Sequence, residues 1–319
     1  MIKKRATRKF LICSAILFAI ALVSLFPNST SSPSFKQELS YTNTSANEEV
    51  IYLLDRYNMI GRTKIAMAEN PNLTSKTREI MSNLISGNNS ENNLPNGFKN
   101  IIPTDTKILS LNVEDKILKI NFSREILNIK QEYEEKMIEA IVYTATEIDG
   151  IDKIIIYVEG DVLTKLPKSK KNLPATLDRS FGINKEYNIK NYKNIKATTV
   201  YYINKLNDDY YYVPVTKYSN DSREKIKIII EELKSSPIHN SNLMSFLNSN
   251  TILLATEQEV NTLFLVFNEY IFSDMDTQKV LEEVVNSISL SVKDNYGIDN
   301  VVFKYKNEEI CKTTLKSIE

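Results

Sequence analysis

The chain of 319 residues is long enough for about two domains, each with a hydrophobic core of its own. Its 40 Lys and Arg residues balance 40 Asp and Glu residues, so its net charge gives no reason to expect nucleic acid as a partner. Two cysteines far apart in the chain and a single histidine exclude a disulfide-built fold and a structural zinc site. The seven glycines form no phosphate-binding loop.

The N-terminal residues carry the pattern of a membrane signal. The basic stretch KKRATRK at 3–9 precedes an uncharged apolar segment at 10–26, which ends at Pro27. Its length suits a short spanning helix better than a cleaved signal, so a signal-anchor is predicted, with cleavage at the small residues of 19–21 as the alternative. The basic flank places the rest of the chain outside the cytoplasmic membrane. Cys13 follows bulky residues that do not suit a lipobox and is interpreted as a buried membrane cysteine.

Two blocks of the chain follow one order of patterns. VIYLLDRYN at 50–58 matches TVYYINKLN at 199–207, and KINFSREIL at 119–127 matches FLVFNEYIF at 264–272. Each block reads as strand, strand, helix, hairpin, longer helix and closing strand. The tripeptide Gly-Ile-Asp precedes the closing strand in both blocks. The sequence therefore predicts a tandem repeat.

The predicted fold class is α+β: two small domains, each a sheet with two helices packed on one face, behind an N-terminal membrane helix. The helices are expected at 74–87, 132–148, 221–236 and 277–295, and the hairpins at 106–127 and 250–272. The shorter helices begin at Thr, Ser or Asp caps, and glycines lie just past the longer ones. The predicted boundaries are 1–26 for the signal-anchor, 27–47 for a flexible linker, 48–167 for the first domain, 168–197 for the connection, 198–311 for the second domain and 312–319 for a tail.

Four acidic residues surround the closing strand of the first block and raise the question of a metal or acid/base site: Asp149, Asp152, Glu159 and Asp161. The first and last of them would lie at opposite ends of a strand about 20 Å long, too far apart to share an ion. The second block keeps only Asp299 of the first pair. Structural turns are therefore favoured, and no catalytic, metal or cofactor-binding residue is predicted.

Three other features have an ordinary interpretation. His239 lies in a polar loop and is expected to be solvated. Cys311 is interpreted as an unremarkable residue of a terminal tail, with a free thiol for intermolecular pairing as the alternative. The tyrosines of DDYYYVPV at 208–215 could form an aromatic platform for sugar, but strand alternation favours a role in the core. The residues singled out are instead a structural repeat signature: Gly150, Ile151, Asp152, Gly297, Ile298, Asp299, Phe122 and Phe267.

The stretch PTDTKILSLNVEDKILKINFSREI at 103–126, followed by a helix and by DGIDKIIIYVEG at 149–160, resembles the GerM domain family of sporulation and spore germination proteins. The resemblance covers two tandem copies between residues 48 and 311. It implies a membrane-tethered extracytoplasmic protein of spore-forming bacteria, with domains similar to the ring-building motifs of secretion systems. It also implies a place in the channel complex that links mother cell and forespore.

The sequence thus predicts a non-enzymatic assembly component of a sporulation or germination envelope complex. A head-to-tail contact between such repeats generates a ring where its rotation closes. The predicted partners are the membrane, through the N-terminal helix, and copies of the chain itself or other sporulation proteins, in proximity to peptidoglycan. The predicted location is the cell membrane, single-pass, with the domains outside and, in sporulating cells, between mother cell and forespore. The alternatives are a module that binds cell-wall glycan or peptide and, third, a wall hydrolase.

Overall fold

The structure is a computed structural model that describes residues 37–40, 48–67, 72–87, 94–207, 209–235 and 242–315. All of these residues belong to one compact unit, Gln37–Glu319. The predicted signal-anchor, Cys13 and His239 lie outside the described residues. Within the described ranges, no helix combines the length and the apolar character that crossing a bilayer requires.

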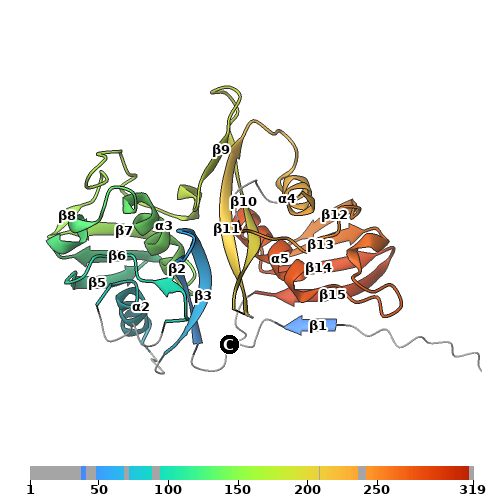
Figure 1. Cartoon of the computed structure of the whole chain (residues 1–319), viewed down its shortest axis with the longest axis horizontal. Coiled ribbons are helices and arrows are strands. Elements are labelled where there is room, and N and C mark those ends of the chain that lie inside the picture. Colours follow the sequence, from blue (N-terminus) through green and yellow to red (C-terminus); the bar gives the residue numbers. More distant parts are fainter. Residues whose placement is uncertain are drawn as a thin grey trace, which may run out of the picture. The chain divides into compact units, whose positions relative to one another are not determined.

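The order of elements predicted for the two blocks is confirmed (Figure 1). The first described element is a short strand, β1 (Gln37–Ser40), and the connection between the blocks holds η3 (Arg179–Phe181) and β9 (Glu186–Asn188). The first block comprises β2 (Glu48–Asp55), β3 (Ile60–Ala66), α2 (Leu73–Ser82), β4 (Phe98–Lys99), β5 (Ile108–Glu114), β6 (Ile117–Phe122), η2 (Arg124–Asn128), α3 (Glu134–Ala145), β7 (Lys153–Val158) and β8 (Asp161–Val162). The second comprises β10 (Lys196–Leu206), β11 (Asp209–Ser219), α4 (Lys225–Lys234), β12 (Leu253–Glu259), β13 (Thr262–Phe267), η4 (Glu269–Ile271), α5 (Glu282–Tyr296), β14 (Asn300–Tyr305) and β15 (Glu308–Thr314).

The expectation of one sheet for each repeat is wrong. The first two strands of both repeats join in a central sheet of order β10-β11-β3-β2-β4, to which β9 adds beside β11. The remaining strands form one separate sheet for each repeat, β5-β6-β7-β8 and β1-β15-β14-β13-β12. In both of these sheets, the strand after the long helix pairs in parallel with the second strand of the hairpin.

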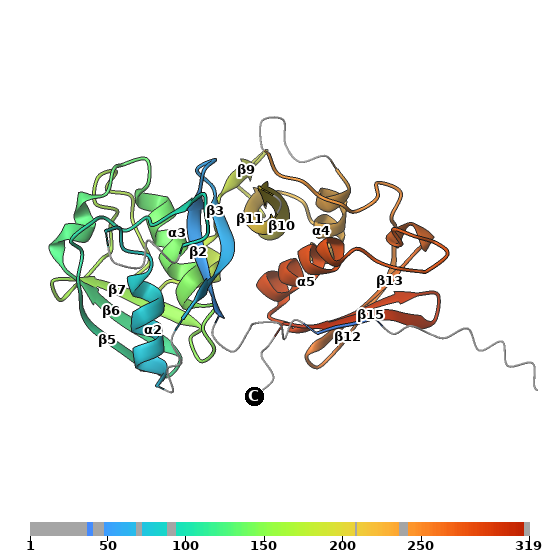
Figure 2. The same ribbon diagram turned by 60° about the horizontal axis from the view of Figure 1, so that its bottom comes forward.

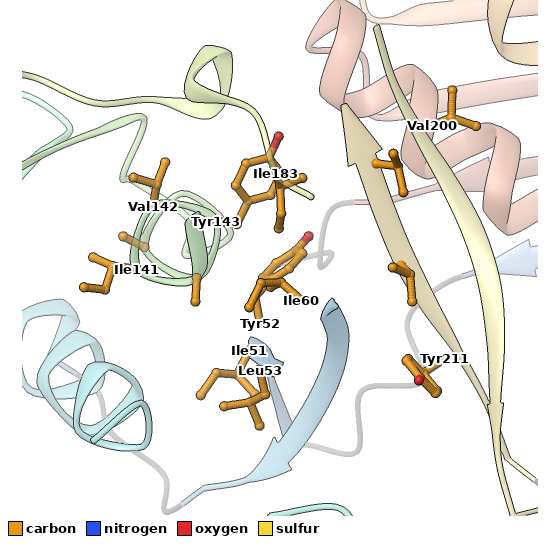
Figure 3. Packing of buried hydrophobic residues seen from close by; sticks show 14 of the residues in the cluster. Ile51, Tyr52, Leu53, Ile60, Ile141, Val142, Tyr143, Ile183, Val200 and Tyr211 are labelled. Atoms are coloured by element: carbon orange, nitrogen blue, oxygen red, sulfur yellow. The ribbon is translucent and has the colours of Figure 1, made fainter. Parts of the chain in front are cut away.

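The burial of the long helices explains this division. In α3, ten of its 12 residues are buried, and α5 is buried over an unbroken run from Val284 to Val292. A helix buried around most of its circumference needs cover on two sides, which one sheet cannot give. α3 therefore contacts both β2 and β7, and α5 contacts both β10 and β14 (Figure 2). Figure 3 shows this core in the first repeat, where Tyr52 of β2 and Tyr143 of α3 meet edge to face at 5.4 Å.

The predicted helix ends are confirmed only in part. Gly297 is the left-handed cap of α5, with φ +66°, and its N–H donates to the Lys293 carbonyl. α3 ends earlier, at Ala145, so Gly150, with φ +88°, lies in the turn before β7 rather than at the cap. α2 is capped by Asn72, whose side chain accepts from the Thr74 N–H, whereas Glu224 at the N-cap position of α4 makes no side-chain cap.

Cys311 does not lie in a tail. It is in the middle of β15, is 2% exposed and packs in the core of the second repeat. Burial raises the pKa of its thiol to about 12. A buried cysteine that stays protonated is a poor nucleophile, so pairing with another chain through Cys311 is not favoured.

Candidate functional site

The two repeats meet at a junction where equivalent residues face each other. β11 pairs with β3 at Tyr212 opposite Arg62. Tyr52 and Tyr201 occupy the same position in the two repeats, and their hydroxyl oxygens are 3.0 Å apart. The Tyr52 N–H donates to Thr144 Oγ1 at 3.0 Å, and the Tyr201 N–H donates to Ser291 Oγ at 2.9 Å. These two helix hydroxyls are also equivalent, so the same strand-to-helix bond is made in both repeats.

A single arginine from the connection joins the two halves of the junction. Arg179 of η3 forms ion pairs with Glu147 and with Asp294, each three residues before the glycine of its repeat. Its Nε also donates to Thr146 Oγ1 at 3.1 Å. The side chains of Glu147 and Asp294 are 8% and 2% exposed, so both carboxylates are removed from bulk water. A planar guanidinium that binds one carboxylate on each side fixes the turn after α3 relative to the last turn of α5.

The two equivalent carboxylates have different surroundings. Glu147 also contacts Arg62 at 3.0 Å and Lys293 at 3.8 Å, whereas Asp294 accepts from the Tyr201 hydroxyl at 2.9 Å. Burial alone would raise the pKa of Glu147, but Lys293, Arg62 and Arg179 outweigh it and hold that pKa well below its usual range. Burial raises the pKa of Asp294, with Arg179 opposing and the neighbouring Glu147 adding to the rise.

The geometry of the junction is that of a structural clamp. Glu147 is a poor general acid or base near neutral pH because its three cationic neighbours stabilise the ionised form. Burial raises the pKa of the Tyr52 and Tyr201 hydroxyls above their ordinary value, so these tyrosines stay protonated as hydrogen-bond donors. The ion pairs and hydrogen bonds of the junction therefore hold the two repeats together.

A second link between the two repeats is made by Asn184, which is also in the connection. Its side chain accepts from the Ile60 N–H at 2.9 Å and donates to the Ile60 and Pro214 carbonyls, each at 2.8 Å. It thereby bonds to β3 of the first repeat and β11 of the second. Its own backbone N–H donates to Glu139 Oε2 of α3 at 2.9 Å. The connection is thus part of the folded junction rather than a loose linker.

Glu139, which accepts from the Asn184 N–H, makes the free energy of unfolding dependent on pH. Its carboxyl is 3% exposed, and burial raises its pKa to about 7, with Lys185 opposing. A carboxyl whose pKa is higher in the folded chain binds more protons when folded, so stability falls as the pH rises from about 4.5 to about 7. We expect Glu139→Gln to remove roughly 2–3 kcal/mol of this fall while keeping the oxygen that accepts from Asn184.

Urea unfolding of both proteins across that pH range measures the difference. Glu134→Gln is the matched control, because Glu134 is on the same helix and hydrogen bonds lower its pKa despite burial. That control should leave the pH dependence between about 5 and 7 unchanged. Parallel curves for wild type and Glu139→Gln would contradict the assignment.

The structure places the predicted signature residues at one joint in each repeat. Ile151 and Ile298 are each 2% exposed in the core. The Asp152 N–H donates to the Lys116 carbonyl at 2.8 Å, and the Asp299 N–H donates to Asn261 Oδ1 at 3.2 Å. Lys116 and Asn261 are equivalent residues in the hairpin turns, so the tripeptide holds the helix-to-strand turn onto the hairpin in both copies.

The other predicted residues also lie in structural positions. Phe122 and Phe267 are fully buried at the ends of equivalent strands. Asp152 pairs with Lys116 at the surface, and Glu159 accepts from the Arg124 N–H. In the part of the chain that the structure describes, no group of three or more His, Cys, Asp or Glu side chains is placed to hold a metal ion. The tyrosines of 208–215 divide, with Tyr211 in the core and Tyr210 43% exposed.

Sequence reasoning missed the junction residues. Arg179 and Asn184 were hidden because the polar, proline-bearing stretch around them is typical of a linker. A signal was present in the repeat itself: tyrosine, a hydroxyl residue and a carboxylate recur at matched positions, as Tyr52, Thr144 and Glu147 and again as Tyr201, Ser291 and Asp294. Buried polar residues that are kept in both copies indicate a shared hydrogen-bond network.

The fold and junction define a tandem α+β repeat protein whose buried charges join its repeats. Residues 50–164 and 199–311 each match the model of the Germane family, described as sporulation and spore germination, and the chain belongs to this family. The chain is 28% identical over 291 residues to spore germination protein GerM of Bacillus subtilis (strain 168), a match that covers 87% of this chain and 78% of that protein. A solved structure of the tandem GerMN domains of the sporulation protein GerM from Bacillus subtilis matches with a TM-score of 0.77 and 25% identity, covering 85% of this chain and 97% of that one. This relationship supports a sporulation-related role.

Proposed function

We propose that the chain is a non-enzymatic scaffold of a sporulation envelope complex, tethered to the membrane by residues 10–26 with its repeats on the extracytoplasmic side. The observation that carries the proposal is the junction, where buried ion pairs from both repeats and the connection make one unit of two similar domains. A rigid unit with related surfaces at each end is suited to side-by-side assembly. The family membership supplies the sporulation context.

Equivalent exposed leucines favour an assembly contact at the sheet edges. β5 and β12 are each the outer strand of their sheet, and the pairing of each with its neighbour is interrupted at the same place by an extra residue. That residue is Leu109 in one repeat and Leu254 in the other, 47% and 60% exposed. A bulge re-aims its side chain, so each sheet edge presents an exposed leucine at the same place.

Deletion of the gene in its spore-forming host is expected to reduce the yield of heat-resistant or germinating spores, and the intact chain should restore it. A chain with Leu109→Asp and Leu254→Asp should restore it poorly, because a carboxylate at an apolar contact is costly to bury. Val260→Asp is the control, since Val260 is 99% exposed in the neighbouring hairpin turn. A normal spore yield from the clean deletion would refute the proposed role.

A further inference from the structure

The β12–β15 sheet of the second repeat has one face that the junction does not use. α5 packs on the opposite face, where Leu263 and Leu265 are buried in the core (Figure 2). Side chains alternate between the two faces along a strand, so Phe264 and Val266 point away from α5. We call this surface the outer face; its centre consists of two rows of residues in register, Glu257–Phe264–Val302 and Ala255–Val266–Lys304.

The equivalent face of the first repeat is more polar. Its two rows are Asn112–Lys119–Ile155 and Ser110–Asn121–Tyr157. Phe264 therefore stands in place of Lys119, which pairs with Glu114 at 2.8 Å, and Val266 stands in place of Asn121. Because both repeats make the same sheet, the fold does not require apolar residues at these positions. An apolar sheet face that the fold does not need indicates a binding surface.

The apolar surface continues at the start of the hairpin. Ile252 is 53% exposed and stands where the first repeat has Lys107. The Ile252 N–H donates to Asn268 Oδ1 at 2.9 Å, and the Lys107 N–H donates to Ser123 Oγ at 2.9 Å, so the two positions are equivalent in structure as well as in sequence. A charged residue of one repeat is thus again replaced by an apolar residue in the other.

Two charges of opposite sign flank the apolar centre of the outer face. Glu257 is exposed and lies opposite Phe264 on the β12 side. Lys304 is on the β14 side, and its Nζ lies 4.2 Å from the centroid of the Phe264 ring, which brings its charge close to the row of Glu257. Among the described residues, neither Glu257 nor Lys304 forms an ion pair. A face with an anion on one side of an apolar centre and a cation on the other is complementary to a copy of itself related by a two-fold axis.

We propose that two copies of the chain associate through the outer faces of their second repeats, about a two-fold axis that runs along β13. This axis places Phe264 and Val266 of one copy against the same residues of the other. It also places Glu257 of each copy beside Lys304 of the other. The two sheets then pack face to face with aligned strands, as in a β-sandwich. The inference goes beyond the scaffold role, because it names a contact between sheet faces that the edge leucines do not supply.

Sedimentation equilibrium of the full chain in detergent, at protein concentrations from about 1 to about 300 μM, tests the proposal. A monomer–dimer equilibrium is expected, with a dissociation constant on the order of 10–100 μM, because the contact is smaller than the roughly 800 Å² that each partner of a stable complex buries. Glu257→Lys and Lys304→Glu should each weaken the dimer at least about tenfold, because each places like charges side by side. The double variant that carries both changes should restore the dimer, because it only exchanges the two charges.

Asn112→Lys and Tyr157→Glu are the matched controls, because they introduce the same charges at the equivalent positions of the first repeat. Both should dimerise as wild type does. A chain that stays monomeric over that range would overturn the proposal, as would single variants that dimerise normally, a double variant no tighter than the single ones, or an equal loss in the controls. Leu109 and Leu254 are unchanged in all of these variants, so the spore-yield test of the scaffold role succeeds or fails separately.

Discussion

Replacing Arg179 with alanine is expected to lower the free energy of unfolding by about 3–5 kcal/mol, because it leaves two buried carboxylates without the cation between them. Folded domains are stable by only about 5–15 kcal/mol, so such a loss is a large part of the total. Urea unfolding of the full chain measures it. Arg179→Lys should recover only part of the loss, since one ammonium cannot match the fork that binds Glu147 and Asp294 at once.

The matched control for Arg179 is Arg223→Ala. Arg223 pairs with Asp221 at 2.7 Å, but its side chain is 52% exposed, and a pair in contact with water contributes little to stability. We expect a change below about 1 kcal/mol for this variant. A loss from Arg179→Ala no larger than that of the control would show that the junction does not hold the repeats together.

The repeat and its elements could be predicted because their causes are local. Apolar spacing in 132–148 and 277–295 identifies helices, and the recurrence of Gly-Ile-Asp locates the turn into the closing strand. Each of these signals lies within one stretch of sequence, and the structure confirms the order of elements that they give. The resemblance based on 103–126 and 149–160 led to the family that the comparison then showed.

The grouping of strands into sheets could not be predicted from such local signals. Whether β2 and β3 join the sheet of β5–β8 or a central sheet with the other repeat depends on what covers the second side of α3, which is a property of the folded chain. The stacking of Tyr187 on Tyr218 could not be predicted for the same reason: the two residues are 31 apart in the chain and become neighbours only when β9 pairs with β11.

Arg179 also illustrates why a polar stretch is ambiguous. Prolines, lysines and asparagines between two patterned blocks are typical of a solvated linker, and composition does not show which one of those residues is buried. Arg179 forms ion pairs with two carboxylates, Glu147 and Asp294, that lie 147 residues apart in the chain. Such a long-range ion pair leaves no periodic trace in sequence.

The two equivalent carboxylates should respond differently to loss of charge. Glu147→Gln is expected to cost about 3 kcal/mol at pH 7, because it leaves Arg62, Arg179 and Lys293 around a neutral group. Asp294→Asn should cost about 1 kcal/mol or less, since an amide still bonds to Tyr201 and Arg179 while the penalty for burying a charge is removed.

The pH dependence of these two costs should have opposite signs. A carboxyl with a lowered pKa contributes stability that is lost as the pH falls, so the cost of Glu147→Gln should shrink between pH 7 and about 3. A carboxyl with a raised pKa binds its proton more readily in the folded chain, so the cost of Asp294→Asn should grow over the same range. Urea unfolding at both pH values gives the two differences. Equal costs with the same pH trend would contradict the prediction and show that Glu147 and Asp294 contribute alike to stability. The predicted difference means that Glu147, in the first repeat, contributes more than Asp294.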